Sequence, residues 1–294
     1  MKRFLLLLVL AAAVAFAIWF GMRGKVRTAS SNAAVVAMLP KETLALVHIP
    51  DISRSLDEWK ETDLYRLWSE PALQEFLQKP LANAGWAGYD AEKLHRQFQR
   101  LRMRDTFVAL TGMDNDQPEI AAGFRFDGRP EDARKVISKW RAAFERHSPG
   151  FITTVIEYKG HHVELMTRDA TAVATAYNHH WFLAANSVEL IKKFLDRFDA
   201  DSKDASATLG GDERYAAAFK HMPNGYAVFA YARLDEYLEK LATRSPDAAT
   251  NPQSAMLRQI QSVAAATTIE EGKMHDVLFV GMPKHGDDGE PARS

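Results

Sequence analysis

The chain has 294 residues with 37 basic and 38 acidic side chains, a formal net charge of −1 and no cysteine. The lack of cysteine excludes disulfides and lipid attachment through a thiol. Because Lys2, Arg3, Arg23, Lys25 and Arg27 precede any acidic residue, the rest of the chain is mildly acidic. An acidic body without a basic stripe argues against a nucleic-acid-binding protein.

An uncharged apolar stretch runs from Phe4 to Met22, directly after two basic residues. A helix of about 20 apolar residues spans the roughly 30 Å hydrocarbon core of a bilayer, and Trp19 suits the membrane interface. We therefore expect residues 4–22 to form a single-pass membrane anchor. The alternative is a cleaved secretory signal, because Ala15-Phe16-Ala17 matches the small-x-small pattern of a cleavage site.

The orientation of this anchor is predicted from its position in the chain. Basic residues on its two sides nearly balance, so the charge bias does not set the orientation by itself. A short N-terminal tail followed by one apolar segment is the usual secretory layout. We expect the large domain to be exported from the inner (cytoplasmic) membrane, or secreted if the segment is cleaved.

Apolar periodicity beyond residue 38 predicts a mixture of strands and helices. The run Thr43–Ile49 is apolar almost throughout, which is typical of a buried strand. Thr62, Asp212 and either Ser187 or Asn186 are suitable helix N-caps, and Pro130 begins a helix with acidic residues in its first turn. The expected strands are 43–49, 106–113, 119–126, 151–158, 161–166, 172–177, 181–185, 226–232, 263–269 and 277–282. The expected helices lie at 62–68, after 71, after 90, from 130, from 187, from 212, through 234–241 and around 256–260.

Short polar turns join four of these strands into an antiparallel meander. The turns fall at Lys159-Gly160, near Asp169 and at 178–180. A polar, glycine-ended segment at 199–211 follows the next helix and is expected to separate two halves of the chain.

The order of elements in the first half recurs in the second. Leu39-Pro40 and Met222-Pro223 each precede a strand, helices and a hairpin, and aligning the two prolines gives an offset of 183 residues. We interpret this as an internal duplication and predict an α+β fold, with a largely antiparallel sheet packed with amphipathic helices in two related halves after one membrane helix. The expected parts are a membrane anchor or signal at 1–27, a tether at 28–38, a first half at 39–198, a loop at 199–211, a second half at 212–282 and a disordered tail at 283–294.

Four segments carry a resemblance to a known family. They are LPKETLALVHIPDI, TDLYRLWSEPALQEFL, ATAVATAYNHHWFLAANSVELIKKFLDRF and DERYAAAFKHMPNGYAVFAYARLDEYLEKL, which together cover most of residues 39–282. In these segments the chain resembles a family of exported, membrane-anchored bacterial proteins grouped only as a domain of unknown function. The resemblance implies an anchored or secreted α+β domain and supplies no activity or catalytic residue.

Two His-His pairs are the sharpest local feature for chemistry. Because alternate turns of a meander meet at one end of the sheet, we expect His161 to lie opposite Asn178 or His179. Imidazoles that converge there suit Zn, Cu or Ni. The hypothesis is a solvent-edge metal site formed by His161, His162, His179 and His180. The alternative is exposed turn histidines, since adjacent strand residues point to opposite faces.

Other motifs favour ordinary structure over catalysis. The acids around Asp199 lack the glycine and the twelfth-position acid of a calcium loop. The basic cluster from Arg96 to Arg104 is flanked by Glu92 and Asp105 and is interpreted as a solvated helix face. Nucleophile-elbow, metalloprotease and phosphate-loop motifs are missing from the sequence, so we expect no cofactor.

These observations favour a non-catalytic role. We expect a membrane-anchored envelope protein that binds a protein or lipid-like partner, or serves structurally, and that does not bind nucleic acid. The alternative is a metal-dependent or other hydrolase that uses the histidine edge. A flat exposed strand edge would favour assembly with a protein partner, and a long apolar groove would favour a lipid.

Overall fold

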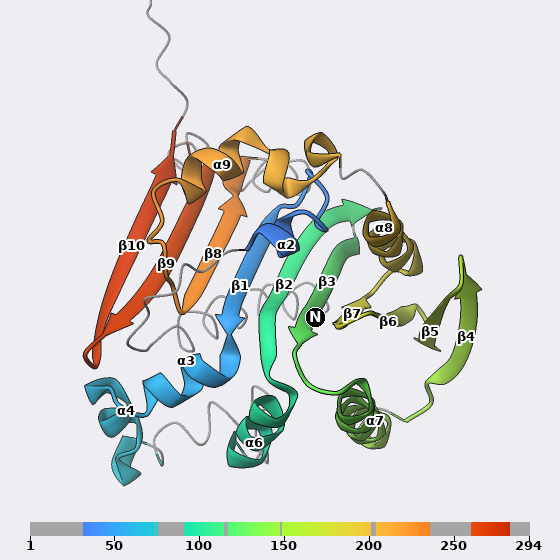
Figure 1. Cartoon of the computed structure of the whole chain (residues 1–294), viewed down its shortest axis with the longest axis horizontal. Coiled ribbons are helices and arrows are strands. Elements are labelled where there is room, and N and C mark those ends of the chain that lie inside the picture. Colours follow the sequence, from blue (N-terminus) through green and yellow to red (C-terminus); the bar gives the residue numbers. More distant parts are fainter. Residues whose placement is uncertain are drawn as a thin grey trace, which may run out of the picture.

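A computed structural model describes residues 32–73, 75, 91–114, 117–147, 149–200, 204–235 and 260–282. Ten antiparallel strands form one open sheet in the order β10-β9-β8-β1-β2-β3-β7-β6-β5-β4. Figure 1 shows the edge strands β10 and β4 at opposite sides of the molecule. The strands are β1 (Ala45–Asp51), β2 (Met103–Asp114), β3 (Gln117–Phe126), β4 (Ile152–Tyr158), β5 (His161–Arg168), β6 (Thr171–Asn178), β7 (Trp181–Ala185), β8 (Val228–Arg233), β9 (Ser262–Glu270) and β10 (Lys273–Gly281).

Helices cover both faces of the sheet. On one face lie α2 (Ala33–Val36), α8 (Val188–Asp199) and α9 (Glu213–Phe219), which pack into the larger of two apolar clusters. On the other lie α3 (Ile52–Trp59), α6 (Ala91–Leu101) and α7 (Pro130–His147), which pack into the smaller cluster. The short helix α4 (Asp63–Trp68) follows α3, and the 3-10 turns η1 (Ala205–Ala207) and η2 (Leu209–Gly211) precede α9.

Strand alternation assigns the two clusters to opposite faces. On β1, Leu46 belongs to the larger cluster, whereas Val47 and Ile49 pack with the smaller one. Successive strand residues point to opposite faces, so a continuous apolar strand supplies both cores. This explains why the run 43–49 has almost no polar residue.

Tight turns set the register of the meander. Lys159 and Gly160 both have positive φ, at 48° and 83°, as a two-residue type I′ hairpin turn requires. Asp169 and His179 also have positive φ, at 52° and 51°, in the next two turns. The predicted order of four antiparallel strands is therefore confirmed.

Most other predicted elements are confirmed within a few residues. The hairpin β2–β3, the helices α4, α6, α7, α8 and α9, and the caps at Thr62, Ser187 and Asp212 all form. The expected α+β class with a largely antiparallel sheet is correct.

The sequence interpretation missed helix α3, which begins directly after β1. Asp51 caps it by accepting a hydrogen bond from the Arg54 amide at 3.0 Å. Its apolar residues Ile52, Leu56 and Trp59 recur at helical spacing. Pro50 ends the apolar run without ending the strand, which continues to Asp51.

The segment expected to be a plain loop between two halves is partly built into the core. Leu209 of η2 is fully buried in the larger cluster, and its amide donates to the Leu39 carbonyl at 3.0 Å. A bridge between Pro40 and Thr208 pairs this segment with the start of the first half.

Several predictions fall outside the described residues. They concern the anchor at 4–22, the helix after 71 beyond its first turn, most of the two helices between 234 and 260, and the tail at 283–294. No helix in the described part of the chain has the length and hydropathy needed to cross a membrane.

One glycine lets β3 approach its neighbours closely. A Cβ on Gly123 would lie 2.8 Å from the Phe182 carbonyl oxygen and 2.8 Å from Phe107 Cε1. We expect Gly123→Ala to reduce the free energy of unfolding by about 1–3 kcal/mol, since overpacking forces backbone shifts. Gly128→Ala, whose Cβ would meet nothing nearer than 3.4 Å, is the matched control and should be neutral. Urea unfolding of both variants measures the difference, and equal stabilities would contradict the prediction.

Candidate functional site

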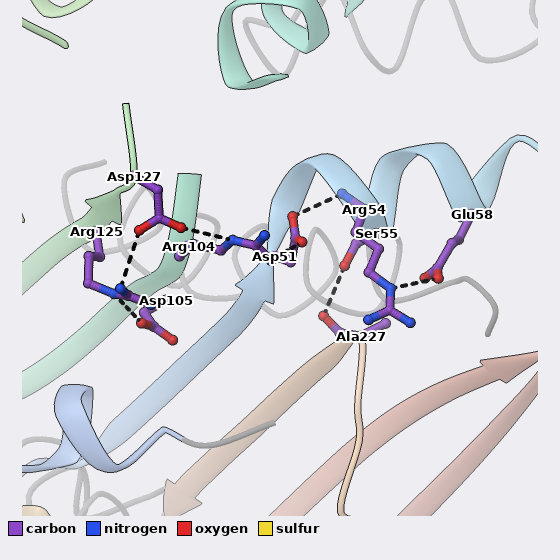
Figure 2. Close-up of polar contacts among 9 residues, drawn as sticks. All are labelled: Asp51, Arg54, Ser55, Glu58, Arg104, Asp105, Arg125, Asp127 and Ala227. Carbon is purple, nitrogen blue, oxygen red and sulfur yellow. Dashed lines mark hydrogen bonds and ion pairs between the residues drawn. The ribbon is translucent and has the colours of Figure 1, made fainter. Parts of the chain in front are cut away.

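A chain of alternating charges runs from β3 through β2 and β1 onto α3 (Figure 2). It begins beside the buried imidazole of His48 on β1 and ends at Glu58 on α3. The pairs Asp105–Arg125, Asp127–Arg104 and Arg104–Asp51 are brought together by the fold, whereas the other three contacts are local in sequence. The members of this charged chain are Asp105, Arg125, Asp127, Arg104, Asp51, Arg54 and Glu58.

His48 is fully buried, with 0% of its surface exposed. Its Nδ1 lies 2.9 Å from the hydroxyl of Tyr226, and its Nε2 lies 3.6 Å from Oδ1 of Asp105. Burial lowers the pKa of His48 more than the adjacent Asp105 carboxylate raises it, so the ring is neutral near pH 7. Because Nε2 faces a carboxylate, we assign the proton to Nε2, and the Tyr226 hydroxyl then donates to Nδ1.

Asp105 reaches His48 because β2 has an irregular register at this point. The pairing with β3 shifts between Arg104 and Phe107, and Asp105 has a positive φ of 46°. Such a bulge redirects a side chain relative to the regular pleat. Burial raises the pKa of Asp105, but its contacts with His48 and with Arg125 Nε, at 2.8 Å, outweigh burial and lower it.

The remaining ion pairs and hydrogen bonds extend the charged chain from β3 to α3. Arg125 donates to Asp127 at 3.3 Å, and Asp127 lies 3.5 Å from Nε of Arg104. Arg104 also pairs with Asp51, the N-cap of α3. Arg54 Nε then donates to Oε1 of Glu58 at 2.8 Å. Each carboxylate in this chain therefore has a cationic or backbone donor.

The far end of the charged chain lies in a shallow depression. Burial raises the pKa of Glu58 to about 7, against the lowering effect of Arg54. The depression has a volume of about 290 Å³ and is lined by Asp51, Ser53, Arg54, Asp57, Glu58, Gln99, Arg102 and Arg104.

A carboxyl group that titrates near neutrality is a candidate general acid or base. The hydroxyl among the described lining residues, Ser53 Oγ, is buried and has no hydrogen-bond partner. It is therefore not held against a base, and His48 is too deeply buried to reach a substrate. These groups are arranged as a structural ion-pair network, which also perturbs pKa values.

The four histidines of the metal hypothesis lie at one end of the sheet, as their register predicts. Val163 on β5 pairs with Ala176 on β6, which brings His161 to the same end as the turn at 179–180. Their partners differ, however. His161 Nε2 contacts Asp199 at 2.8 Å, and His162 pairs with Glu157 on the neighbouring strand.

The second histidine pair has different neighbours. His180 packs edge-on against Phe126, with ring centroids 5.7 Å apart. His179 and His180 line an open depression of about 480 Å³ with Arg125, Asp127, Trp181 and Phe198. Over the residues described, no three His, Cys, Asp or Glu side chains form a group that could hold a metal ion. The metal hypothesis therefore gains no support from this geometry.

The edge strand β4 of the described sheet exposes large apolar side chains. Ile152 and Val155 are 68% and 60% exposed, and β4 pairs on one side only, with β5. Residues 152–156 are all β-branched, which favours extended pairing. The strand's single charge, Glu157, lies beside the turn.

The other edge strand, β10, also exposes apolar residues. Leu278 is 67% exposed. In contrast to β4, this strand carries a charge near its middle, Asp276, which accepts a hydrogen bond from the Thr267 hydroxyl at 2.7 Å. Charged residues are one device by which proteins protect a sheet edge from unwanted pairing.

Comparison of the chain with protein-family models, curated proteins and solved structures gives no match.

The charged chain was not predicted from the sequence, and the predicted position of two of the nearby arginines was wrong. Arg102 and Arg104 were expected on a helix face, but α6 ends at Leu101 and Arg104 lies on β2. The available signals were a histidine inside an otherwise apolar strand and an acid directly before Ile52. Neither signal identifies its partners, because those come from distant strands.

The raised pKa of Glu58 predicts a pH dependence of stability. The folded state holds this proton up to about pH 7, whereas the unfolded state releases it near 4.5. The associated stability is fully present below pH 4.5 and is lost as the pH rises through 7. Between these pH values the free energy of unfolding of the wild-type protein should fall by up to roughly 3 kcal/mol relative to that of Glu58→Gln, because glutamine stays neutral at every pH. Urea unfolding of both proteins at pH 4 to 8 measures this, and parallel pH profiles would contradict it.

Proposed function

We propose that this protein is a non-catalytic binding module of the cell envelope that takes up a strand from a protein partner at the free edge of β4. One observation carries the proposal: among the described residues, β4 is a sheet edge paired on one side only, with Ile152 and Val155 largely exposed. An exposed, apolar and charge-poor edge is a template for strand addition.

Backbone hydrogen bonds supply the affinity in this mode of binding. Each net hydrogen bond contributes about 0.5–1.5 kcal/mol, and exposed β-branched side chains add apolar contact. Because a strand edge recognises a polypeptide backbone, this geometry favours a protein partner over a lipid-like one.

We further propose that residues 4–22 anchor the module in the inner membrane with the large domain exported. The length and hydropathy of that stretch support the anchor. The resemblance to exported, anchored proteins of unknown function fits the same placement.

The two halves of the chain are proposed to be related by duplication. The unit β1–β2–β3 and the unit β8–β9–β10 each contain a strand followed later by a hairpin, and β1 pairs antiparallel with β8 at the junction. The observed partner of Val47 is Ala230, which lies 183 residues further on, the offset obtained by aligning the two prolines. This supports a local two-fold relation through that pair.

Anchoring predicts where the protein is found after cell breakage. Full-length protein should remain in the membrane fraction after extraction at high pH, because an apolar helix resists removal. A variant that lacks residues 1–27 should appear in the soluble fraction, as detected by immunoblot. Recovery of intact full-length protein in the cytosolic fraction would contradict the anchor.

Strand addition predicts crosslinks from β4 that depend on a free edge. A photo-crosslinking amino acid at Thr153 should give adducts in intact membranes. Val155→Lys in the same chain should reduce the adducts at least about tenfold, because a lysine blunts the edge. The matched control is Leu278→Lys, at a similarly exposed position on β10, which should leave the adducts unchanged. Adducts that are absent, or equally abundant in both lysine variants, would refute strand addition at β4.

A further inference from the structure

We propose that the strand received by β4 is β4 of a second copy of this chain, paired antiparallel about a two-fold axis through Val155. This inference rests on the proposed function, since it names the partner for the same edge. It follows from which backbone groups β4 leaves unpaired and from the residues that a symmetric register brings together.

The hairpin turn decides which groups point outward. In the type I′ turn at Lys159-Gly160, the turn hydrogen bond joins the flanking residues Tyr158 and His161. The β4–β5 register continues without a shift to Ile152 opposite Thr167. In an antiparallel ladder, hydrogen-bonded pairs alternate with non-bonded pairs. Residues 152, 154, 156 and 158 therefore bond to β5, and Thr153, Val155 and Glu157 direct their backbone groups outward.

The three outward residues of one copy can pair with the same three residues of a second copy. In the register centred on Val155, Val155 faces Val155 and Thr153 faces Glu157 of the other copy. Each facing pair can exchange both hydrogen bonds, so every outward N–H and C=O of 153, 155 and 157 obtains a partner.

The side chains in this register agree with the backbone. Ile152 lies opposite Tyr158, which places an exposed apolar residue against an aromatic ring. Glu157 lies opposite the neutral Thr153, so two carboxylates never face each other, and His162 already pairs with Glu157 within its own chain. Like charges directly opposite would weaken the pairing, and this register avoids them.

Symmetric pairing also closes the assembly. A β4–β10 contact is heterologous and could continue from copy to copy without end, whereas a two-fold β4–β4 contact uses each β4 once and closes at two copies. The paired strand is short, so the interface belongs to the weak class below about 1,200 Å². Confinement of two anchored copies to one membrane raises their effective concentration and favours such a weak contact.

The lack of cysteine makes this register directly testable by disulfide trapping in the full-length, membrane-embedded protein. Facing residues of a hydrogen-bonded pair have Cα atoms about 5.5 Å apart, within the range that a disulfide spans. Under mild oxidation, Val155→Cys should form disulfide-linked dimers at least about tenfold faster than Thr153→Cys or Leu278→Cys. The double variant Thr153→Cys/Glu157→Cys should also crosslink, with mass spectrometry finding 153 joined to 157.

The outcomes separate this inference from the proposed function. The two-fold register would be overturned if Val155→Cys formed disulfide-linked dimers no faster than Leu278→Cys. It would also be overturned if the double variant formed disulfides between residue 153 of one copy and residue 153 of the other. The photo-crosslinking residue at position 153 could still give adducts that Val155→Lys reduces and whose mass differs from that of two copies of the chain. Strand addition would then stand, and self-pairing would fall. If neither disulfides nor photo-adducts formed, both would fall.

Discussion

The central constraint on this structure is that each backbone N–H and C=O of a sheet needs a partner. The ten strands satisfy one another across nine antiparallel interfaces, from β10 to β4. The β1–β8 pairing is the contact that makes one sheet from the two ends of the chain. Among the described strands, the open sheet leaves two edge rows of backbone groups, and β4 presents its row beside exposed side chains of which only Glu157 is charged. The proposed binding role rests on this row, which has no partner among the described strands.

The charged chain explains how the middle of the sheet is fixed to its helices. It connects Asp105 on β2 with Arg125 on β3 and, through Arg104, with the N-cap of α3. At its inner end the neutral His48 bonds to Tyr226, just before β8. On the helix side the Ser55 hydroxyl donates to the Ala227 carbonyl at 3.3 Å. Removing one partner from such a network leaves a buried charge or polar group uncompensated, which is costly. We therefore regard these perturbed residues as stabilising groups, although their pKa shifts resemble those of catalytic groups.

Local signals in the sequence predicted much of the sheet but little of the polar network. Gly160 and the caps Thr62 and Ser187 act on their immediate neighbours, so turns and helix starts could be inferred. The bulge at Asp105 depends on the pairing of β2 with β3, which the local pattern does not reveal. The histidine pairs illustrate both cases. The meander correctly brought them to one end of the sheet, but the acidic partners of His161 and His162 come from α8 and β4.

The most direct test of the central claim is residue-resolved amide hydrogen exchange along β4 in membrane-embedded, full-length protein. If β4 receives a partner strand, the outward amides of Thr153, Val155 and Glu157 should exchange slowly in wild-type protein and at least about tenfold faster in Val155→Lys. The inward amides of Thr154 and Ile156, which bond to β5, should be protected in both. Outward amides that exchange equally fast in both proteins would contradict the account, because β4 would then be a solvent-exposed edge with no strand beside it.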